Sequence, residues 1–420
     1  MGVIRVAGYG RLDATGLGGP PNGGEAAPPP EPPATAVPDG CPSCGLPGDA
    51  DDRYCESCGY DLDIPATPVA ERPPPRRVPT PSGHGPVCSA CGTATIGSDG
   101  WCEACGRPFN PRDHVESDLS GLVAMVSNRG LRHRRNEDSA ALRAFEMPDG
   151  SKRVVAVVCD GVSSSPRPDE ASATAATTAC ATMAATLIEG CAPAKATSAG
   201  VAAAASAVAR MPGIEDQGNA PACTLVSAIM APGEITVGWV GDSRAYWLAD
   251  PGSGADDPAD GDDTLPGAST LPRGAVGESD GADDEQGRRT PSALLTEDDS
   301  WATRMIALGA MTEAEAYADR RAHAIVSWLG ADAGEVRPRV TSVRPSGPGV
   351  LLLCSDGLWN YLSVAPTLAA MVLPDALEQP LAAARLLTGF ALDQGGADNI
   401  TVALIPYLPP GDAARGPLHD

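Results

Sequence analysis

Acidic side chains next to apolar runs are the residues of this sequence best suited to chemistry. The acidic motifs are Asn136-Glu137-Asp138, Asp160-Gly161, Ser355-Asp356-Gly357 and Asp398-Asn399. Two of them follow the apolar runs 154–159 and 350–354, and a third opens the run 400–405. A carboxylate at a strand end lies where a rigid scaffold meets a loop, a common place for functional groups. Carboxylates gathered from distant segments need a cation between them, and hard oxygen ligands favour magnesium or manganese over zinc.

Each Asp-Gly pair taken alone has a simpler explanation, because Asp-Gly is a frequent turn dipeptide. The four motifs together, each at the border of an apolar run, favour a shared metal-centred site over four unrelated turns.

Five segments, in order, resemble the type 2C metal-dependent protein phosphatases (PPM family). They are Arg129-Gly130 leading to Asn136-Glu137-Asp138-Ser139, Val158–Val162, Gly241–Tyr246, Leu353–Trp359 and Gly396–Thr401. The resemblance covers about residues 118–408 and implies an α+β domain, a β-sandwich of two antiparallel sheets flanked by helices. It further implies a bacterial-type enzyme that hydrolyses phosphoserine and phosphothreonine in proteins, through a metal-bridging hydroxide that attacks phosphorus in line.

The same resemblance assigns roles to the acidic residues. The catalytic and metal-binding set that it implies, for two or three manganese or magnesium ions, is Glu137, Asp138, Asp160, Gly161 (through its carbonyl oxygen), Asp356 and Asp398. Asp160 would bridge two ions. Asp242 resembles the ligand of a third ion in bacterial relatives, and a corner-capping aspartate is the alternative interpretation.

Two positions depart from the family pattern. Relatives usually carry a phosphate-binding arginine five residues before the aspartate of the Asn-Glu-Asp motif, whereas this sequence has His133 between Arg132 and Arg134. We expect this trio to bind phosphate without the usual bidentate clamp, or with it moved to a neighbour. The segment 162–165 also replaces a common Gly-Gly pair. These changes keep open a second hypothesis, a pseudo-phosphatase that binds phosphoproteins as a scaffold.

Cysteine pairs before residue 106 predict two structural zinc ribbons. Four Cys-x-x-Cys-Gly units repeat with the same spacing, and each can turn two thiolates toward a tetrahedral centre. The predicted zinc ligands are Cys41, Cys44, Cys55, Cys58, Cys88, Cys91, Cys102 and Cys105. The ribbons span residues 41–106, are joined by a stiff proline-rich linker (65–86), and are expected to target or regulate the enzyme through a partner that the sequence does not identify.

Composition bounds the remaining possibilities. The formal net charge of −24 argues against nucleic acid and anionic membranes as partners, which sets aside ribbons that bind nucleic acid. No signal-peptide pattern or long apolar span stands out, so a cytoplasmic protein is expected. Residues 1–40 and the acidic insert 250–290 are predicted to be disordered. The expected partner is a phosphorylated protein, so the enzyme would oppose a serine/threonine kinase.

Hydrophobic periodicity predicts the elements that would position the site. Strands are expected at Leu122–Ser127, Val154–Cys159, Thr224–Ala231, Ile235–Val240, Ala245–Leu248, Val350–Cys354 and Ile400–Ile405. Helices are expected at Glu170–Glu189, Ala194–Arg210, Thr312–Ala318 and Leu381–Asp393. We predict Asp169 as the N-cap of the first helix and a hairpin or bulged corner at Gly241–Arg244. The segments that begin at Leu295 and Met311 resemble the flap of bacterial members of the PPM family, with a capping box at Thr312 and with His323 expected in a packing role.

Overall fold

The computed structural model describes residues 96–97, 101–106, 110–213, 220–250 and 290–409. Several predictions concern residues outside these ranges: the tail 1–40, the linker 65–86, residues 251–289 of the acidic insert, and the cysteines Cys41, Cys44, Cys55, Cys58, Cys88 and Cys91.

One sheet of the described domain has five antiparallel strands, in the order β11-β7-β6-β4-β3. The strands are β3 (Ser139–Glu146), β4 (Lys152–Cys159), β6 (Leu225–Ala231), β7 (Glu234–Val240) and β11 (Arg339–Val343). The apolar run in β4 is continuous rather than alternating because both faces of this sheet are covered. Val155 and Val157 pack toward helices, while Val154, Ala156 and Val158 pack into the core between the sheets.

The second sheet has six antiparallel strands, in the order β1-β2-β13-β12-β8-β9. The strands are β1 (His114–Asp118), β2 (Ala124–Asn128), β8 (Arg244–Ala249), β9 (Ala293–Leu294), β12 (Gly349–Cys354) and β13 (Ile400–Tyr407). A short ladder joins β5 (Ala222–Cys223) to β10 (Leu329–Gly330). Because β1 belongs to the six-stranded sheet, that sheet begins before residue 118, the predicted start of the domain.

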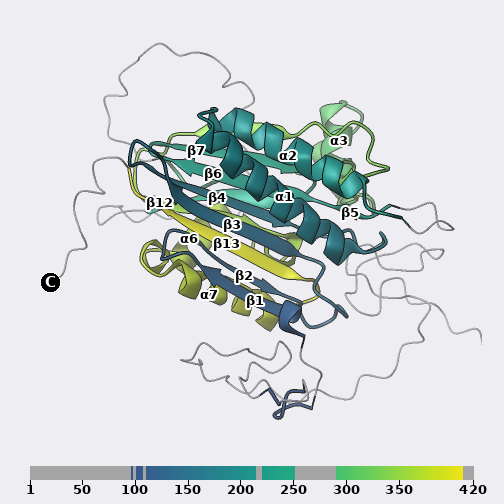
Figure 1. Ribbon diagram of the computed structural model, residues 1–420. Helices are drawn as coiled ribbons and strands as arrows, with labels where there is room; N and C mark the ends of the chain where they lie inside the picture. Colours follow the sequence, from purple (N-terminus) through teal and green to yellow (C-terminus); the bar gives the residue numbers. More distant parts are fainter. Residues whose placement is uncertain (1–95, 98–100, 107–109, 214–219, 251–289, 410–420) are drawn as a thin grey trace, which may run out of the picture. The chain divides into compact units, whose positions relative to one another are not determined.

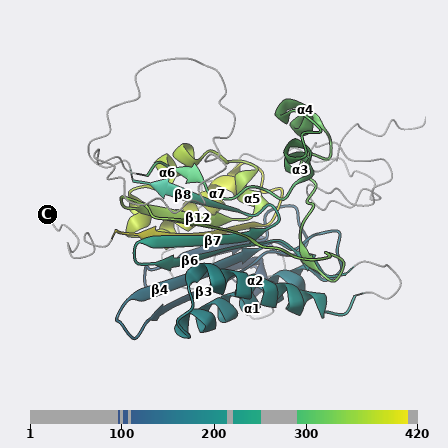
Figure 2. The same ribbon diagram turned by 90° about the horizontal axis from the view of Figure 1, so that it is seen from above.

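Helices cover the outer faces of both sheets (Figures 1 and 2). The pair α1 (Pro168–Ile188) and α2 (Pro193–Ala209) packs on the five-stranded sheet. On the six-stranded sheet lie α5 (Asp356–Trp359), α6 (Ala365–Val372) and α7 (Pro380–Asp393). Apolar side chains from both sheets fill the space between them, including the fully buried Trp247 and Leu351. The predicted α+β sandwich of two antiparallel sheets flanked by helices is confirmed.

The predicted strands and helices all lie within one or two residues of observed elements, one local prediction is wrong, and the structure decides between the two alternatives of another. Asp169 is not an N-cap: α1 begins at Pro168, the N-cap position is Arg167 in a left-handed conformation, and Asp169 lies in the first turn. The segment at Gly241–Arg244 is not a hairpin, because β7 and β8 belong to different sheets. It is the alternative, a corner through which the chain crosses from one sheet to the other.

Helix α1 qualifies the expectation that no segment could cross a membrane. Its 21 residues are long and apolar enough to do so by length and composition, with a mean hydropathy of 1.3 over the qualifying window. Half of that window is buried, and the buried side packs on β3 and β4. The apolar character of α1 is therefore accounted for by its place over the five-stranded sheet.

Candidate active site

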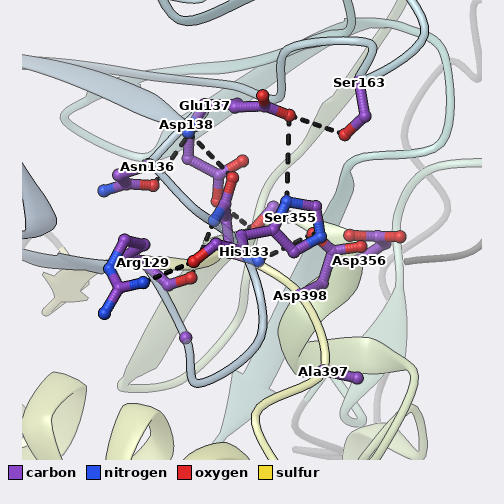
Figure 3. Close-up of polar contacts among 12 residues, drawn as sticks. Arg129, His133, Asn136, Glu137, Asp138, Ser163, Ser355, Asp356, Ala397 and Asp398 are labelled. Atoms are coloured by element: carbon purple, nitrogen blue, oxygen red, sulfur yellow. Dashed lines mark hydrogen bonds and ion pairs between the residues drawn. The ribbon is translucent and has the colours of Figure 1, made fainter. Parts of the chain in front are cut away.

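The acidic motifs meet at one end of the sandwich because of how their strands pair. Asp160 directly follows β4, and Asp138 directly precedes β3, whose first residue pairs with Cys159. Asp356 lies two residues beyond Cys354, the last residue of β12, and Cys354 pairs with Val402 near the start of β13, which Asp398 precedes. Four segments far apart in the sequence thus deliver carboxylates to one place, and Figure 3 shows those of Glu137, Asp138, Asp356 and Asp398.

The proximity of these carboxylates shifts their pKa values. Burial raises the pKa of Asp160 well above its ordinary value, and the charges of Asp138, Asp356, Asp398 and Asp242 raise it further. Burial also raises the pKa of Asp138, to about 6, against hydrogen bonds that lower it. Such crowding of like charges favours the protonated carboxyl groups unless a cation neutralises them.

The unpaired oxygens at this centre fit divalent cations. Asp138 Oδ1 and Asp356 Oδ1 are buried and accept no hydrogen bond from the described residues. Within the same residues, no three His, Cys, Asp or Glu side chains are arranged so that they could hold a metal ion as they stand. The oxygen ligands available here suit magnesium or manganese, which keep several water ligands and need only a few carboxylates, better than zinc.

Two residues that the sequence analysis left without a role hold the site together. Ser355 donates from Oγ to Asp138 Oδ2 at 2.7 Å and accepts from the Thr401 amide at 3.0 Å. The side chain of Asn399 accepts from the Glu137 amide at 2.8 Å and donates to the carbonyl of Arg129 at 2.8 Å. Both residues are adjacent in the sequence to an aspartate of the acidic motifs, and this adjacency was the sequence feature that could have pointed to their role. Their hydrogen bonds tie the loop 129–138 to the starts of α5 and β13.

Of the three predicted phosphate-binding residues, the structure brings His133 into the acidic centre. Its imidazole is buried, with Nε2 3.0 Å from Asp398 Oδ1 and Nδ1 3.9 Å from Glu137 Oε2 (Figure 3). Arg132 and Arg134 are exposed. The histidine therefore lies among the carboxylates, whereas its two arginine neighbours lie at the surface.

The carboxylate of Glu137 is buried and accepts hydrogen bonds from two nearby side chains. Its Oε2 accepts a hydrogen bond from Ser163 at 2.6 Å, so the segment that replaces the usual Gly-Gly contacts the site directly. Its Oε1 accepts from Arg135 Nε at 2.9 Å. The sequence analysis assigned no role to Arg135.

Asp242 lies at the corner between β7 and β8 and faces the acidic centre. Burial raises its pKa well above the ordinary value, and the charge of Asp356 is the next largest cause. Trp359 of α5 donates from its indole nitrogen to the Asp242 carbonyl at 3.0 Å, and the guanidinium of Arg244 lies over the Trp359 ring at 3.8 Å.

The predicted flap consists of α3 (Trp301–Ala307) and α4 (Glu313–Ala318), packed around Ala302, Ala316 and Ala322. The capping box is confirmed: Thr312 and Glu315 exchange side-chain and backbone hydrogen bonds. The ring of His323 lies 6.3 Å from the rings of both Tyr317 and Trp359. This is the packing role expected for His323, and it links the flap to α5.

The cysteines near the site are core residues. Cys159 and Cys354 are fully buried, and burial raises the pKa of both thiols above their usual range. A thiol in that state is a poor nucleophile. Of the predicted zinc ligands, the described residues include Cys102, which is buried, and Cys105, which is exposed.

Gly130 provides a test of how closely the loops of the site approach. It has a φ of +73°, and an added Cβ would stand 2.0 Å from the Asp398 carbonyl oxygen. Gly121 has a nearly identical φ of +72° with nothing within 4 Å. Gly130→Ala should therefore lower the free energy of unfolding by about 2 kcal/mol more than Gly121→Ala, since only the first adds steric overlap to backbone strain. Urea denaturation of both variants measures the difference, and equal losses would contradict the close approach.

Comparison with known proteins gives matches that cover part of the chain. The family model described as "Protein phosphatase 2C" matches residues 129–253. The serine/threonine protein phosphatase PstP of Mycobacterium tuberculosis is 27% identical over 206 residues, which are 49% of this chain and 30% of that protein. The chain thus spans less than a third of the length of the curated relatives it matches first.

Solved structures of phosphatases resemble the fold at low identity. A bacterial serine phosphatase is 18% identical with a TM-score of 0.48, covering 69% of this chain and 98% of that one. The M. tuberculosis phosphatase PstP/Ppp is 24% identical with a TM-score of 0.44, covering 69% of this chain and 98% of that one.

Proposed function

We propose that this chain is a metal-dependent serine/threonine protein phosphatase of the protein phosphatase 2C family. The observation that carries the proposal is the gathering of Asp138, Asp160, Asp356 and Asp398 at one end of the sandwich, where the other three carboxylates raise the pKa of Asp160. The family model over residues 129–253 supports it, because that stretch contains the first two acidic motifs and the corner at Asp242.

The cofactors in this proposal are manganese or magnesium ions, two with a third at Asp242. When bound, they would supply positive charge opposite the phosphoryl oxygens and acidify a water molecule for attack on phosphorus. Asp160 would serve both ions, Asp356 and Asp398 would complete one site, and Glu137 or Asp138 with the Gly161 carbonyl would serve the second, largely through water.

The protein's own contribution is to hold these groups in place. Ser355 fixes one oxygen of Asp138 and leaves Oδ1 free of described partners, so that oxygen can face a cation or a water. Asn399 fixes the backbone of the Glu137 loop. The packed strands and the hydrogen bonds from neighbouring residues already hold these side chains in place. They therefore need to move little when the substrate binds.

The substrates in this proposal are proteins phosphorylated on serine or threonine, so the enzyme opposes a serine/threonine kinase in the cytoplasm. Residues 41–106 serve as two zinc ribbons that target or regulate it, with Cys102 and Cys105 among the eight thiolate ligands. Elemental analysis for zinc tests this last point, which a folded, zinc-free protein would contradict.

The experiment that tests the activity uses metal-stripped protein and a phosphothreonine peptide. Phosphate release should be absent with chelator and should return when manganese is added, because the crowded carboxylates need the cation to stay ionised together. Manganese binding without phosphate release would overturn the enzyme proposal and favour the phosphoprotein-binding scaffold.

A further inference from the structure

A substrate phosphoryl group is a dianion, and the metal ions can face only some of its oxygens. A guanidinium group suits the others, because it offers five N–H donors in a planar fork that matches phosphate geometry. The question is which arginine of this chain can supply that fork, given that position 133 is a histidine. This step rests on the proposed phosphatase function.

Two arginines beside the site are already committed to structural contacts. Arg129 pairs with Asp113 at 3.0 Å and donates to the His133 carbonyl oxygen. Arg244 makes two hydrogen bonds to Asp298, at 2.9 and 2.7 Å. Neither guanidinium can turn to a substrate without breaking a partly buried ion pair, which is costly.

Arg135 differs because it reaches from solvent to the acidic centre. Its side chain is 48% exposed, whereas that of its partner Glu137 is 9% exposed. Nε lies 2.9 Å from Glu137 Oε1, and Nη1 lies 3.6 Å from Asp169 Oδ1 at the start of α1. The guanidinium is therefore beside one of the proposed metal-site carboxylates and open to an incoming ligand.

The two carboxylates orient the fork without using all of it. Glu137 contacts Nε of Arg135 and Asp169 contacts Nη1. The third nitrogen, Nη2, contacts no partner in the described residues. The longer pair, to Asp169, is of the partly exposed kind that contributes little to stability and exchanges readily. We propose that Arg135 binds the phosphoryl group of the substrate, with Glu137 and Asp169 holding its guanidinium in position.

The histidine at position 133 is placed differently. Its Nε2 lies 3.0 Å from Asp398 Oδ1, so the ring is engaged with a carboxylate of the centre. An imidazole also lacks the two parallel donors that a bidentate phosphate contact requires. In this proposal the phosphate-binding arginine stands two residues further along the loop than position 133, at Arg135.

The test compares Arg135→Ala with Arg337→Ala in the full-length, manganese-loaded protein. Arg337 is a matched control because it also pairs with a glutamate two residues away, Glu335, and is 80% exposed. Arg135→Ala should raise KM for a phosphothreonine peptide and the inhibition constant for inorganic phosphate by about 10- to 100-fold, the size of a lost charge-assisted hydrogen bond. Arg337→Ala should change neither constant.

Additional variants separate phosphate binding from a structural role. Manganese affinity, measured by calorimetry, should not fall in Arg135→Ala, whereas damage to the Glu137 loop would weaken it. Arg135→Lys should recover only part of the phosphate affinity, because it keeps the charge and loses the fork. Unchanged phosphate inhibition in Arg135→Ala, or a loss that appears instead in Arg132→Ala or Arg134→Ala, would overturn the proposal.

Failure of the role proposed for Arg135 can be distinguished from failure of the proposed phosphatase function. If wild-type protein releases no phosphate with manganese, the phosphatase proposal fails, whatever Arg135 does. If wild-type protein is active and Arg135→Ala behaves like Arg337→Ala, the phosphatase stands and the role of Arg135 is refuted.

Discussion

Asp160→Asn should lower manganese-dependent phosphate release by at least about 10³-fold, or about 4 kcal/mol of transition-state stabilisation. Asp160 stands at the centre of the acidic cluster, where Asp138, Asp356, Asp398 and Asp242 all act on it. Asparagine keeps the shape of the side chain but removes the charge that attracts the cations. Initial rates on a phosphothreonine peptide, at saturating manganese, measure the loss.

The same substitution should have the opposite effect on the metal-free protein. Removing one of several mutually repelling carboxylates should raise the melting temperature in chelator, while the increase caused by manganese should disappear. Asp149→Asn is a suitable control, because Asp149 is an exposed turn residue that bonds to Ser151. Retained turnover, or an Asp160→Asn protein that is less stable without metal, would contradict the assignment of Asp160 to the centre of the site.

The second large effect is an unusual dependence of stability on pH in the metal-free protein. The folded-state pKa of Asp138 is raised from 3.8 to about 6, mainly by burial. Below pH 3.8 this carboxyl group is protonated in both states and contributes nothing. Between these two pH values the folded state holds a proton that the unfolded state has lost, so stability falls as pH rises. Above about pH 6 the buried carboxylate is ionised, and its ionisation lowers the free energy of unfolding by its full amount, on the order of 3 kcal/mol for this group.

The other carboxylates strengthen this trend, because burial and mutual repulsion raise the pKa values of Asp356 and Asp398 as well. Glu116 acts the other way, but its pKa is lowered to about 2, so its contribution changes only below about pH 4.5. Melting temperatures in chelator should therefore fall steadily from pH 4.5 to 7.5.

Asp138→Asn tests whether the acidic site is the cause. In chelator, the melting temperature of Asp138→Asn should fall less steeply with pH than that of the wild-type protein. Manganese should reverse the fall in the wild-type protein, because ionised carboxylates bind the cation. Asp149→Asn should leave the slope unchanged, since the pKa of Asp149 is lowered rather than raised. A melting temperature that rises from pH 4.5 to 7.5 without metal would show that these carboxylates are not crowded in solution.

Much of the scaffold could be predicted from sequence because its central elements are buried on both sides. A strand covered by helices on one face and by a second sheet on the other is apolar throughout, so runs such as 154–159 and 350–354 are conspicuous. The partly exposed strands β1, β3 and β11 lack this signal and were not predicted. The corner at Asp242 was ambiguous because turn residues do not reveal whether the next strand joins the same sheet.

The sequence by itself indicated the candidate metal ligands, because acidic residues at the borders of apolar runs are a local pattern. Only the tertiary structure decided how the surrounding polar groups divide their roles. It buried His133 against Asp398, directed Arg135 to Glu137 and Asp169, and brought Ser355 to Asp138. These partners depend on loops that meet only when the two sheets pack together, and no spacing along the chain encodes that meeting.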